Sequence, residues 1–166
     1  MKTIYSGIIC AVFFMAAVVQ AADVTITING QVVAQPCTIA TTTADVDLGN
    51  LSTVNLESAG AVSDWKSVTL DLTNCPVGTS SVKATFSGTS DSTGTYFLNQ
   101  GTAGKIAVQL ADSSGNNITN GGALTSDVND STLATSFNLQ VRAITPSGSA
   151  TQGSIQSVID VTYTWQ

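Results

Sequence analysis

The chain has 166 residues, of which 43% are hydrophobic and 10% charged, and its 5 basic and 11 acidic residues give a formal net charge of −6. This length accommodates one globular domain with a sizeable core. Nucleic acid is excluded as a partner because phosphate contacts need clustered Lys and Arg. The sequence contains no histidine, which excludes Ser–His and Cys–His nucleophiles and His-ligated metals. Low charge and abundant Thr, Ser and Gly favour an all-β domain.

Residues 1–21 have the pattern of a secretory signal peptide. Lys2 precedes an apolar run over residues 8–19, and Val19-Gln20-Ala21 places small or compact residues at the cleavage positions. The run is shorter than the roughly 20 residues that cross a bilayer, which disfavours a membrane anchor. We therefore expect cleavage after Ala21 and export of residues 22–166.

Two cysteines remain in the exported chain once Cys10 leaves with the signal peptide. Cys37 and Cys75 form an even pair, and an even pair in an exported protein predicts a disulfide. A metal or redox pair is disfavoured because the two residues lack Cys-x-x-Cys spacing and no further soft ligand accompanies them.

Apolar and polar residues alternate in short runs along the exported chain, with turn-forming residues between the runs. Alternation with a period of two predicts half-buried strands, and no segment sustains the helical period of 3.6. Short strands punctuated in this way are typical of an immunoglobulin-like β-sandwich. The Thr/Ser/Gly-rich stretch 87–104 is interpreted as a long loop or a strand switch. The alternating runs are Val24–Ile28, Val68–Leu72, Val82–Phe86, Ile106–Leu110, Phe137–Ala143 and Ile155–Trp165.

The first run permits two interpretations. Its apolar positions precede Cys37, and as an edge strand it would be long and almost uncharged, which invites pairing with another chain. It is therefore either the first strand of the sandwich or a detachable strand that pairs with a different molecule. The positions concerned are Val24, Ile26, Ile28, Gly30 and Val32.

The last run ends at Gln166, directly after Tyr163 and Trp165. A sandwich of seven strands needs one more strand beside this run, and without it an apolar groove stays open. Gly153 is the fourteenth residue from the end and Trp165 the second.

Together these residues resemble pilin subunits of the chaperone–usher pathway, in particular the minor tip-fibrillum adaptor subunits of type 1 fimbriae. The similarity covers essentially all of residues 22–166. Subunits of this family usually carry tyrosine second from the end, where this chain retains an aromatic residue as Trp165. The stretches that carry the resemblance are Ala22–Gly30, Val33–Thr38, Leu70–Ser80, Leu139–Ala143, Ala150–Gly153 and Val161–Trp165.

The resemblance implies an incomplete immunoglobulin-like sandwich of six strands plus an N-terminal donor strand, lacking the seventh strand. Residues 22–36 would be the donor-strand extension and residues 37–166 the pilin domain. Donor-strand exchange would make the chain a structural subunit that links the tip adhesin to the rest of the fibre. The implied donor positions are Val24, Ile26, Ile28, Gly30 and Val32, and the implied acceptor-groove and C-terminal-motif positions are Gly153, Ile155, Ile159, Val161, Tyr163 and Trp165.

The same resemblance implies the partners. They are the pilin domain of the adhesin, the next fibrillum subunit, a periplasmic chaperone and an outer-membrane usher. The chain would pass through the periplasm to the pilus at the cell surface. We expect no cofactor, metal, nucleic acid or small-molecule substrate.

Two other functions were weighed. An exported carbohydrate-binding β-sandwich would stack a sugar on Trp65 or on Tyr96-Phe97, which we interpret instead as core or loop aromatics. An exported enzyme could use paired carboxylates for glycoside hydrolysis, and the candidate pairs are Asp45 with Asp47 and Asp127 with Asp130. No nucleophile elbow, Ser-x-x-Lys motif or phosphate-binding loop accompanies them, so we expect no catalysis.

Overall fold

The computed structural model describes residues 25–31 and 35–166. These two ranges belong to separate units, so each is described by itself. The predicted signal peptide, Val24 and Val32 lie outside the described residues. Across the part of the chain that is described, no helix has the length and apolar character needed to cross a membrane.

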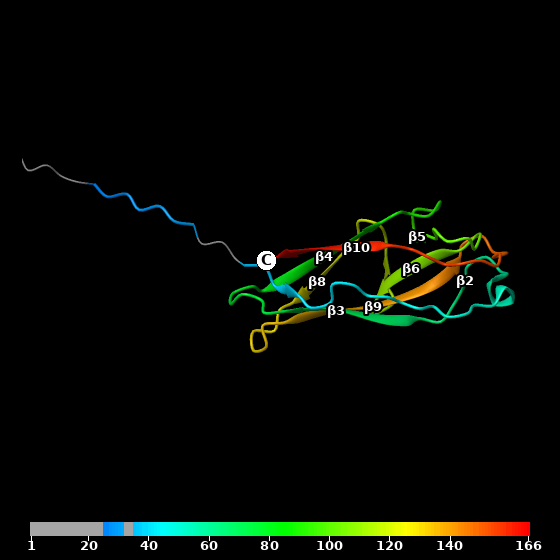
Figure 1. Cartoon of the computed structure of the whole chain (residues 1–166), viewed down its shortest axis with the longest axis horizontal. Coiled ribbons are helices and arrows are strands. Elements are labelled where there is room, and N and C mark those ends of the chain that lie inside the picture. The colour runs from blue at the N-terminus through cyan, green and yellow to red at the C-terminus, as the bar shows by residue number, and fades with distance from the viewer. Residues whose placement is uncertain (1–24, 32–34) are drawn as a thin grey trace, which may run out of the picture. The chain divides into compact units, whose positions relative to one another are not determined.

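Residues 35–166 form a β-sandwich of two antiparallel sheets (Figure 1). Alternating side chains let each strand bury one face, so the two sheets share a core between them. The only helical element among the described residues is the 3-10 turn η1 (Thr53–Leu56). The predicted all-β, immunoglobulin-like class is confirmed.

The larger sheet has the order β1-β3-β9-β6-β5, with β2 paired to β9 and β7 paired to β6. The long strands β3 and β9 form its centre, with Leu70 opposite Phe137 and Val68 opposite Leu139. Its strands are β1 (Thr38–Ile39), β2 (Ala61–Val62), β3 (Lys66–Thr73), β5 (Phe97–Leu98), β6 (Ala107–Asp112), β7 (Asn117–Ile118) and β9 (Thr135–Thr145).

The smaller sheet has the order β10-β4-β8. It consists of β4 (Ser81–Gly88), β8 (Ala123–Asp127) and β10 (Ile159–Trp165). Because β4 lies in the middle, its inward side chains Val82, Ala84 and Phe86 are completely buried. After β4 the chain crosses to the larger sheet as β5, so of the two interpretations of residues 87–104, a long loop or a strand switch, the structure shows the switch.

Two strand predictions are corrected. The last strand begins at Ile159 and not at Ile155, because residues 155–158 bond irregularly to the loop before β6 and do not join a ladder. The strand β6 is buried on both faces, whereas alternation predicted a half-buried strand. The Gln109 side chain, on the outer face of β6, accepts a hydrogen bond of 2.7 Å from Nε of Arg142 on β9. The Arg142 side chain therefore lies over the outer face of β6 at this position.

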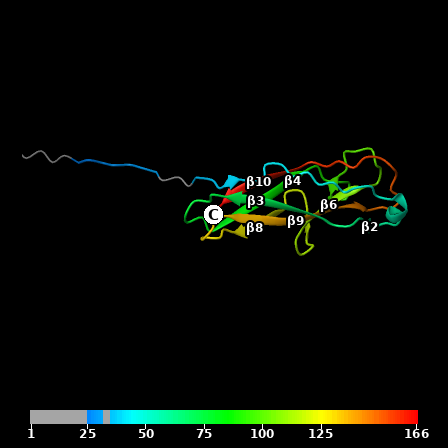
Figure 2. The ribbon, with the colours of Figure 1, turned by 60° about the horizontal axis from the view of Figure 1, so that its bottom comes forward.

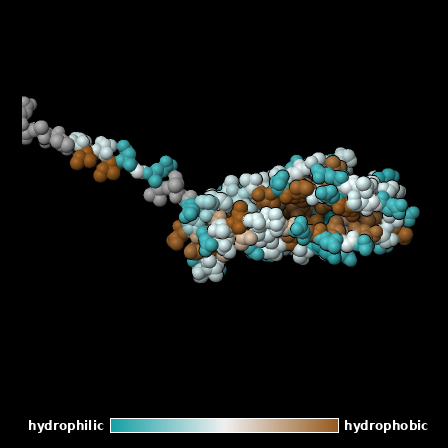
Figure 3. All heavy atoms as spheres, viewed as in Figure 1, coloured by the Kyte–Doolittle hydropathy of each residue, from teal (hydrophilic) through white to brown (hydrophobic). Residues whose placement is uncertain are grey.

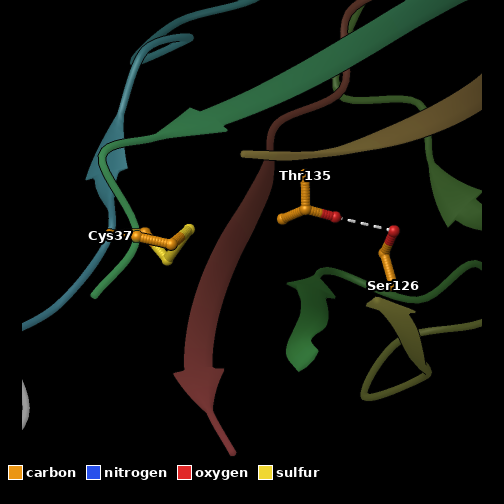
Figure 4. The surroundings of a disulfide bond; sticks show 4 residues. Cys37, Ser126 and Thr135 are labelled. Carbon is orange, nitrogen blue, oxygen red and sulfur yellow. Dashed lines mark hydrogen bonds between the residues drawn. A yellow bond between two sulfur atoms is a disulfide. The ribbon is translucent and has the colours of Figure 1, made fainter. Parts of the chain in front are cut away.

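The predicted disulfide between Cys37 and Cys75 is present (Figure 4). It joins the residue before β1 to the turn after β3, and both cysteines are buried in the core. Nearby, the hydroxyl of Thr135 on β9 donates a hydrogen bond of 2.8 Å to the Ser126 hydroxyl on β8. Since β9 and β8 belong to different sheets, this bond ties the two layers together at that end.

Candidate functional site: an open apolar groove

A groove of about 650 Å³ runs along one side of the domain. One wall is β10 with residues 150–157, and the other is the segment of residues 44–51. Both walls follow the same side of the domain in Figure 2, and Figure 3 shows apolar atoms gathered in a hollow beside β10. The floor consists of core side chains from both sheets, namely Val68, Leu70, Phe86, Val108, Leu110, Leu139 and Val141.

The β10 wall is paired along one edge only. Its register with β4 runs from Ile159 opposite Gly88 to Trp165 opposite Val82. Among the described residues, β10 has no second ladder partner, so its other edge presents unpaired backbone groups to the groove. Such an edge is a template for another strand. Alternation points Ile159, Val161, Tyr163 and Trp165 toward the core and leaves Asp160, Thr162 and Thr164 exposed.

The opposite wall is extended chain that forms no ladder. After β1, backbone pairing with β3 ends at Thr41, whose amide donates to the Asp71 carbonyl at 3.3 Å. Within the described chain, residues 42–51 make no backbone hydrogen bond to another element. Val46, Leu48 and Leu51 are half-buried toward the groove. The groove therefore lies between two backbone edges that both lack partners.

A hydrogen-bonded clasp closes the groove at the end where β10 begins. It joins the loop 99–104 to residues 151–156, with the Ala103 amide donating to the Ser154 carbonyl at 3.0 Å. Gly153 lies at this contact, and a Cβ there would meet the backbone of Thr102 and Ala103. This close approach explains why a glycine stands fourteenth from the end.

The structure brings four of the six predicted groove positions to the groove lining. These are Gly153, Ile155, Ile159 and Val161. Tyr163 and Trp165 lie further along β10, where they are half-buried against the core and are not part of the lining. The Tyr163 ring lies 6.0 Å from that of Phe137. Burial raises the pKa of the Tyr163 hydroxyl above its ordinary value.

Sequence reasoning missed the wall formed by residues 44–51. Val46 and Leu48 alternate there with Asp45 and Asp47, and this short alternation is the signal that indicates it. From the sequence alone, the two aspartates are a candidate catalytic pair and nothing more. The structure instead places them, exposed, on the wall of the groove.

The predicted donor positions that the structure describes are exposed. Ile26 is 79% and Ile28 89% exposed, and Gly30 has nothing within 4 Å of where a Cβ would be. Residues 25–31 belong to no strand. The alternation that predicted a strand is thus present without any pairing for these residues.

Two of the aromatic side chains considered for sugar binding are packed within the domain. The Arg142 guanidinium lies over the Trp65 ring, 4.0 Å from its centroid, and covers one face of the indole. Phe97 is completely buried, whereas its neighbour Tyr96 is half-buried. Among the described residues, no three Asp, Glu, Cys or His side chains gather in a way that would hold a metal.

Comparisons with known proteins identify the family. The family model described as fimbrial protein matches residues 26–164. The chain belongs to the fimbrial protein family. It is 57% identical over 159 residues to Protein FimG of Escherichia coli (strain K12), covering 95% of each chain. It is 50% identical over 157 residues to the uncharacterized fimbrial-like protein YdeR of the same strain, covering 95% of this chain and 92% of that one.

The fold is also shared with solved pilus proteins. The crystal structure of the P pilus rod subunit PapA superposes with a TM-score of 0.66 at 21% identity, covering 80% of this chain and all of PapA. At this identity the likeness shows the fold. Family membership makes the chain a structural subunit of a surface pilus rather than an enzyme.

Proposed function

We propose that this chain joins two neighbours in a pilus by exchanging strands. Residues 22–36 would complete a preceding subunit, and the groove of residues 37–166 would receive the extension of a following one. The observation that carries the proposal is the apolar groove between two unpaired backbone edges, those of β10 and residues 42–51.

A strand of the donor type fits this groove in its chemistry. Its main chain would supply hydrogen bonds to both edges, and its alternate side chains would fill the apolar floor. Burying four apolar side chains at about 1.5–3 kcal/mol each gives roughly 6–12 kcal/mol. This is comparable with the whole stability of a typical domain, about 5–15 kcal/mol. A domain with an empty groove would therefore be marginally stable, and a filled one very stable.

The ladders among the described residues are antiparallel, which favours an inserted strand that runs antiparallel to β10. Antiparallel to β10, it would run from the Trp165 end toward the clasp at Gly153. If the five predicted donor positions face inward in register, Val24 lies near Trp165 and Val32 near Ser157. Each subunit would then lie head to tail on the next, since residues 35–37 leave the domain at the end where β10 finishes.

Before assembly the open groove would need a cover. We propose that a periplasmic chaperone lends a strand during transit and that an outer-membrane usher directs the exchange. The half-buried aromatics Tyr163 and Trp165 support this role by anchoring the strand along which the chaperone would pair. The resemblance to tip-fibrillum adaptors supports a place between the adhesin and the next fibrillum subunit.

The test is thermal unfolding of residues 22–166 with and without a donor strand fused after Gln166. A short turn after Gln166 lets a copy of residues 22–36 run back along the free edge of β10. The expected result is a rise in midpoint of about 20 °C or more, from the stabilisation above and about 3 °C per kcal/mol.

A matched control fusion carries Ser at the five inward positions and the same turn. It should leave the midpoint unchanged, because it supplies backbone without apolar side chains. If both fusions leave the midpoint where it is, the domain is complete on its own and the proposal is wrong.

A further inference from the structure

Carboxylates stand at the mouth of the groove. Asp45 and Asp47 are part of its lining, and the lining includes no Lys or Arg. On the other wall, Asp160 lies on β10 between the lining residues Ile159 and Val161. Both walls therefore present negative charge next to the unpaired edges.

These three carboxylates are on the solvent side of the groove. On residues 44–51 the apolar Val46 and Leu48 are half-buried, while Asp45 and Asp47 between them are exposed. Asp160 is exposed between two half-buried neighbours. A strand inserted between the walls would thus point its inward side chains at the apolar floor. Its outward side chains would lie between Asp45 and Asp47 on one side and Asp160 on the other.

The basic residues of the domain do not neutralise this mouth. None of the basic residues in the described chain is part of the groove lining. They are Lys66 at the start of β3, Lys83 on β4 opposite Thr164 of β10, Lys105 before β6, and Arg142 on β9 over the Trp65 ring. Asp47 uses one carboxylate oxygen to accept a hydrogen bond of 2.8 Å from the Gly49 amide, which holds its charge in place on this wall.

A second copy of this chain does not bring the complementary charge. With Ile26 and Ile28 facing inward, the outward positions between residues 25 and 31 are uncharged: Thr25, Thr27, Asn29 and Gln31. Residues 22–36 contain Asp23 and no Lys or Arg.

We propose that the groove selects a donor strand from a different subunit, one that carries Lys or Arg at its outward positions, over a second copy of this chain. Opposite charges directly across neighbouring strands stabilise a sheet, and like charges destabilise it. Charge complementarity also raises the rate of encounter. The inference rests on the proposed function, because it concerns the occupant of the same groove.

Three peptides with the sequence of residues 22–36 test this selection. One is unchanged, one carries Thr27→Lys with Asn29→Lys, and one carries Thr27→Glu with Asn29→Glu. Lys and Glu are both poor strand formers, so the pair differs mainly in charge. The measurement is the association rate of each labelled peptide with the purified chain at low salt and in 1 M NaCl.

We expect the lysine peptide to associate about ten-fold faster than the glutamate peptide at low salt, and the difference to fall to about two-fold or less in 1 M NaCl, where charges are screened. The triple variant Asp45→Asn, Asp47→Asn, Asp160→Asn should lose most of this preference. A matched variant with Asp71→Asn, Asp127→Asn and Asp130→Asn makes the same change in net charge outside the groove lining and should keep it.

The outcomes separate the two proposals. If all three peptides associate equally at every salt concentration, the charge selection is wrong and strand exchange stands. If both triple variants lose the preference equally, the overall charge of the chain acts instead of the groove, and the inference is again wrong. If no peptide associates at all, the proposed function fails with it.

Discussion

Residues 25–31 and strand β10 have the same alternation of apolar and polar side chains but opposite surroundings. β10 pairs with β4 and half-buries its apolar face, whereas Ile26 and Ile28 stay 79% and 89% exposed. The comparison shows that alternation makes a segment able to form a strand, but that the segment joins a sheet only where a neighbouring strand is available to pair with it. Among the described residues, 25–31 pair with no strand and β10 pairs along one edge, which suits the proposed exchange of strands with two neighbours.

Placing the same charged residue in each segment tests the comparison most strongly. Val161 lies opposite the completely buried Phe86, so Val161→Asp puts a carboxylate against the core. We expect it to lower the free energy of unfolding by about 2–4 kcal/mol. Ile28→Asp, on an exposed side chain, should change it by less than about 0.5 kcal/mol. Urea unfolding of the two variants measures both values, and equal losses would show that residues 25–31 are buried in their own domain.

Gly153, in the domain, and Gly30, in residues 25–31, test the same contrast with a smaller expected effect on stability. A Cβ on Gly153 would meet the backbone of Thr102 and Ala103, so Gly153→Ala forces the clasp apart. Overpacking of this kind costs about 1–3 kcal/mol. Gly30→Ala meets nothing within 4 Å and should leave the unfolding midpoint unchanged. A Gly153→Ala variant as stable as the parent would mean that the clasp yields without cost.

The smallest expected effect is a loss of thermal stability at alkaline pH caused by Tyr163 on β10. Burial raises the pKa of Tyr163 above its ordinary value of 10.0, so the folded chain holds this proton more tightly than the unfolded chain. The resulting stability is complete below pH 10 and is lost as the pH rises through the folded-state pKa. Tyr163→Phe keeps the ring against Phe137 and removes the titration. Its thermal midpoint should therefore fall less than that of the parent between pH 8 and pH 11, and parallel curves would contradict the assignment.

The sequence predicted the elements whose partners are in the same chain. Alternation located β3, β4 and β9, and the even cysteine pair predicted the disulfide. It did not locate the start of β10, because residues 155–158 have the alternation of a strand but bond irregularly at the clasp. It also did not show that β6 is covered on both faces, since Arg142 reaches Gln109 only after the sheet has formed.

The groove itself was half predicted. The alternation of the run Ile155–Trp165 indicated one wall, and the sheet order shows that β10 pairs along one edge among the described residues. The other wall depends on where residues 44–51 lie after β1. A local alternation of apolar and polar residues does not predict which distant part of the chain such a segment will face. The donor positions Val24, Ile26, Ile28, Gly30 and Val32 remain a prediction from the sequence, which the exchange experiments above address.

The position of the disulfide sets how the domain would bear mechanical load. A pull on the extension enters the domain at Cys37, immediately before β1, and β1 pairs with β3 over only two residues. Such a short ladder would peel open one hydrogen bond at a time under tension. The covalent link to Cys75 instead passes the pull to the turn that follows β3, a strand paired over seven residues with β9. If residues 22–36 connect neighbouring subunits as proposed, the disulfide directs force from this extension to the centre of the larger sheet, and the two-residue strand at its edge is protected from peeling.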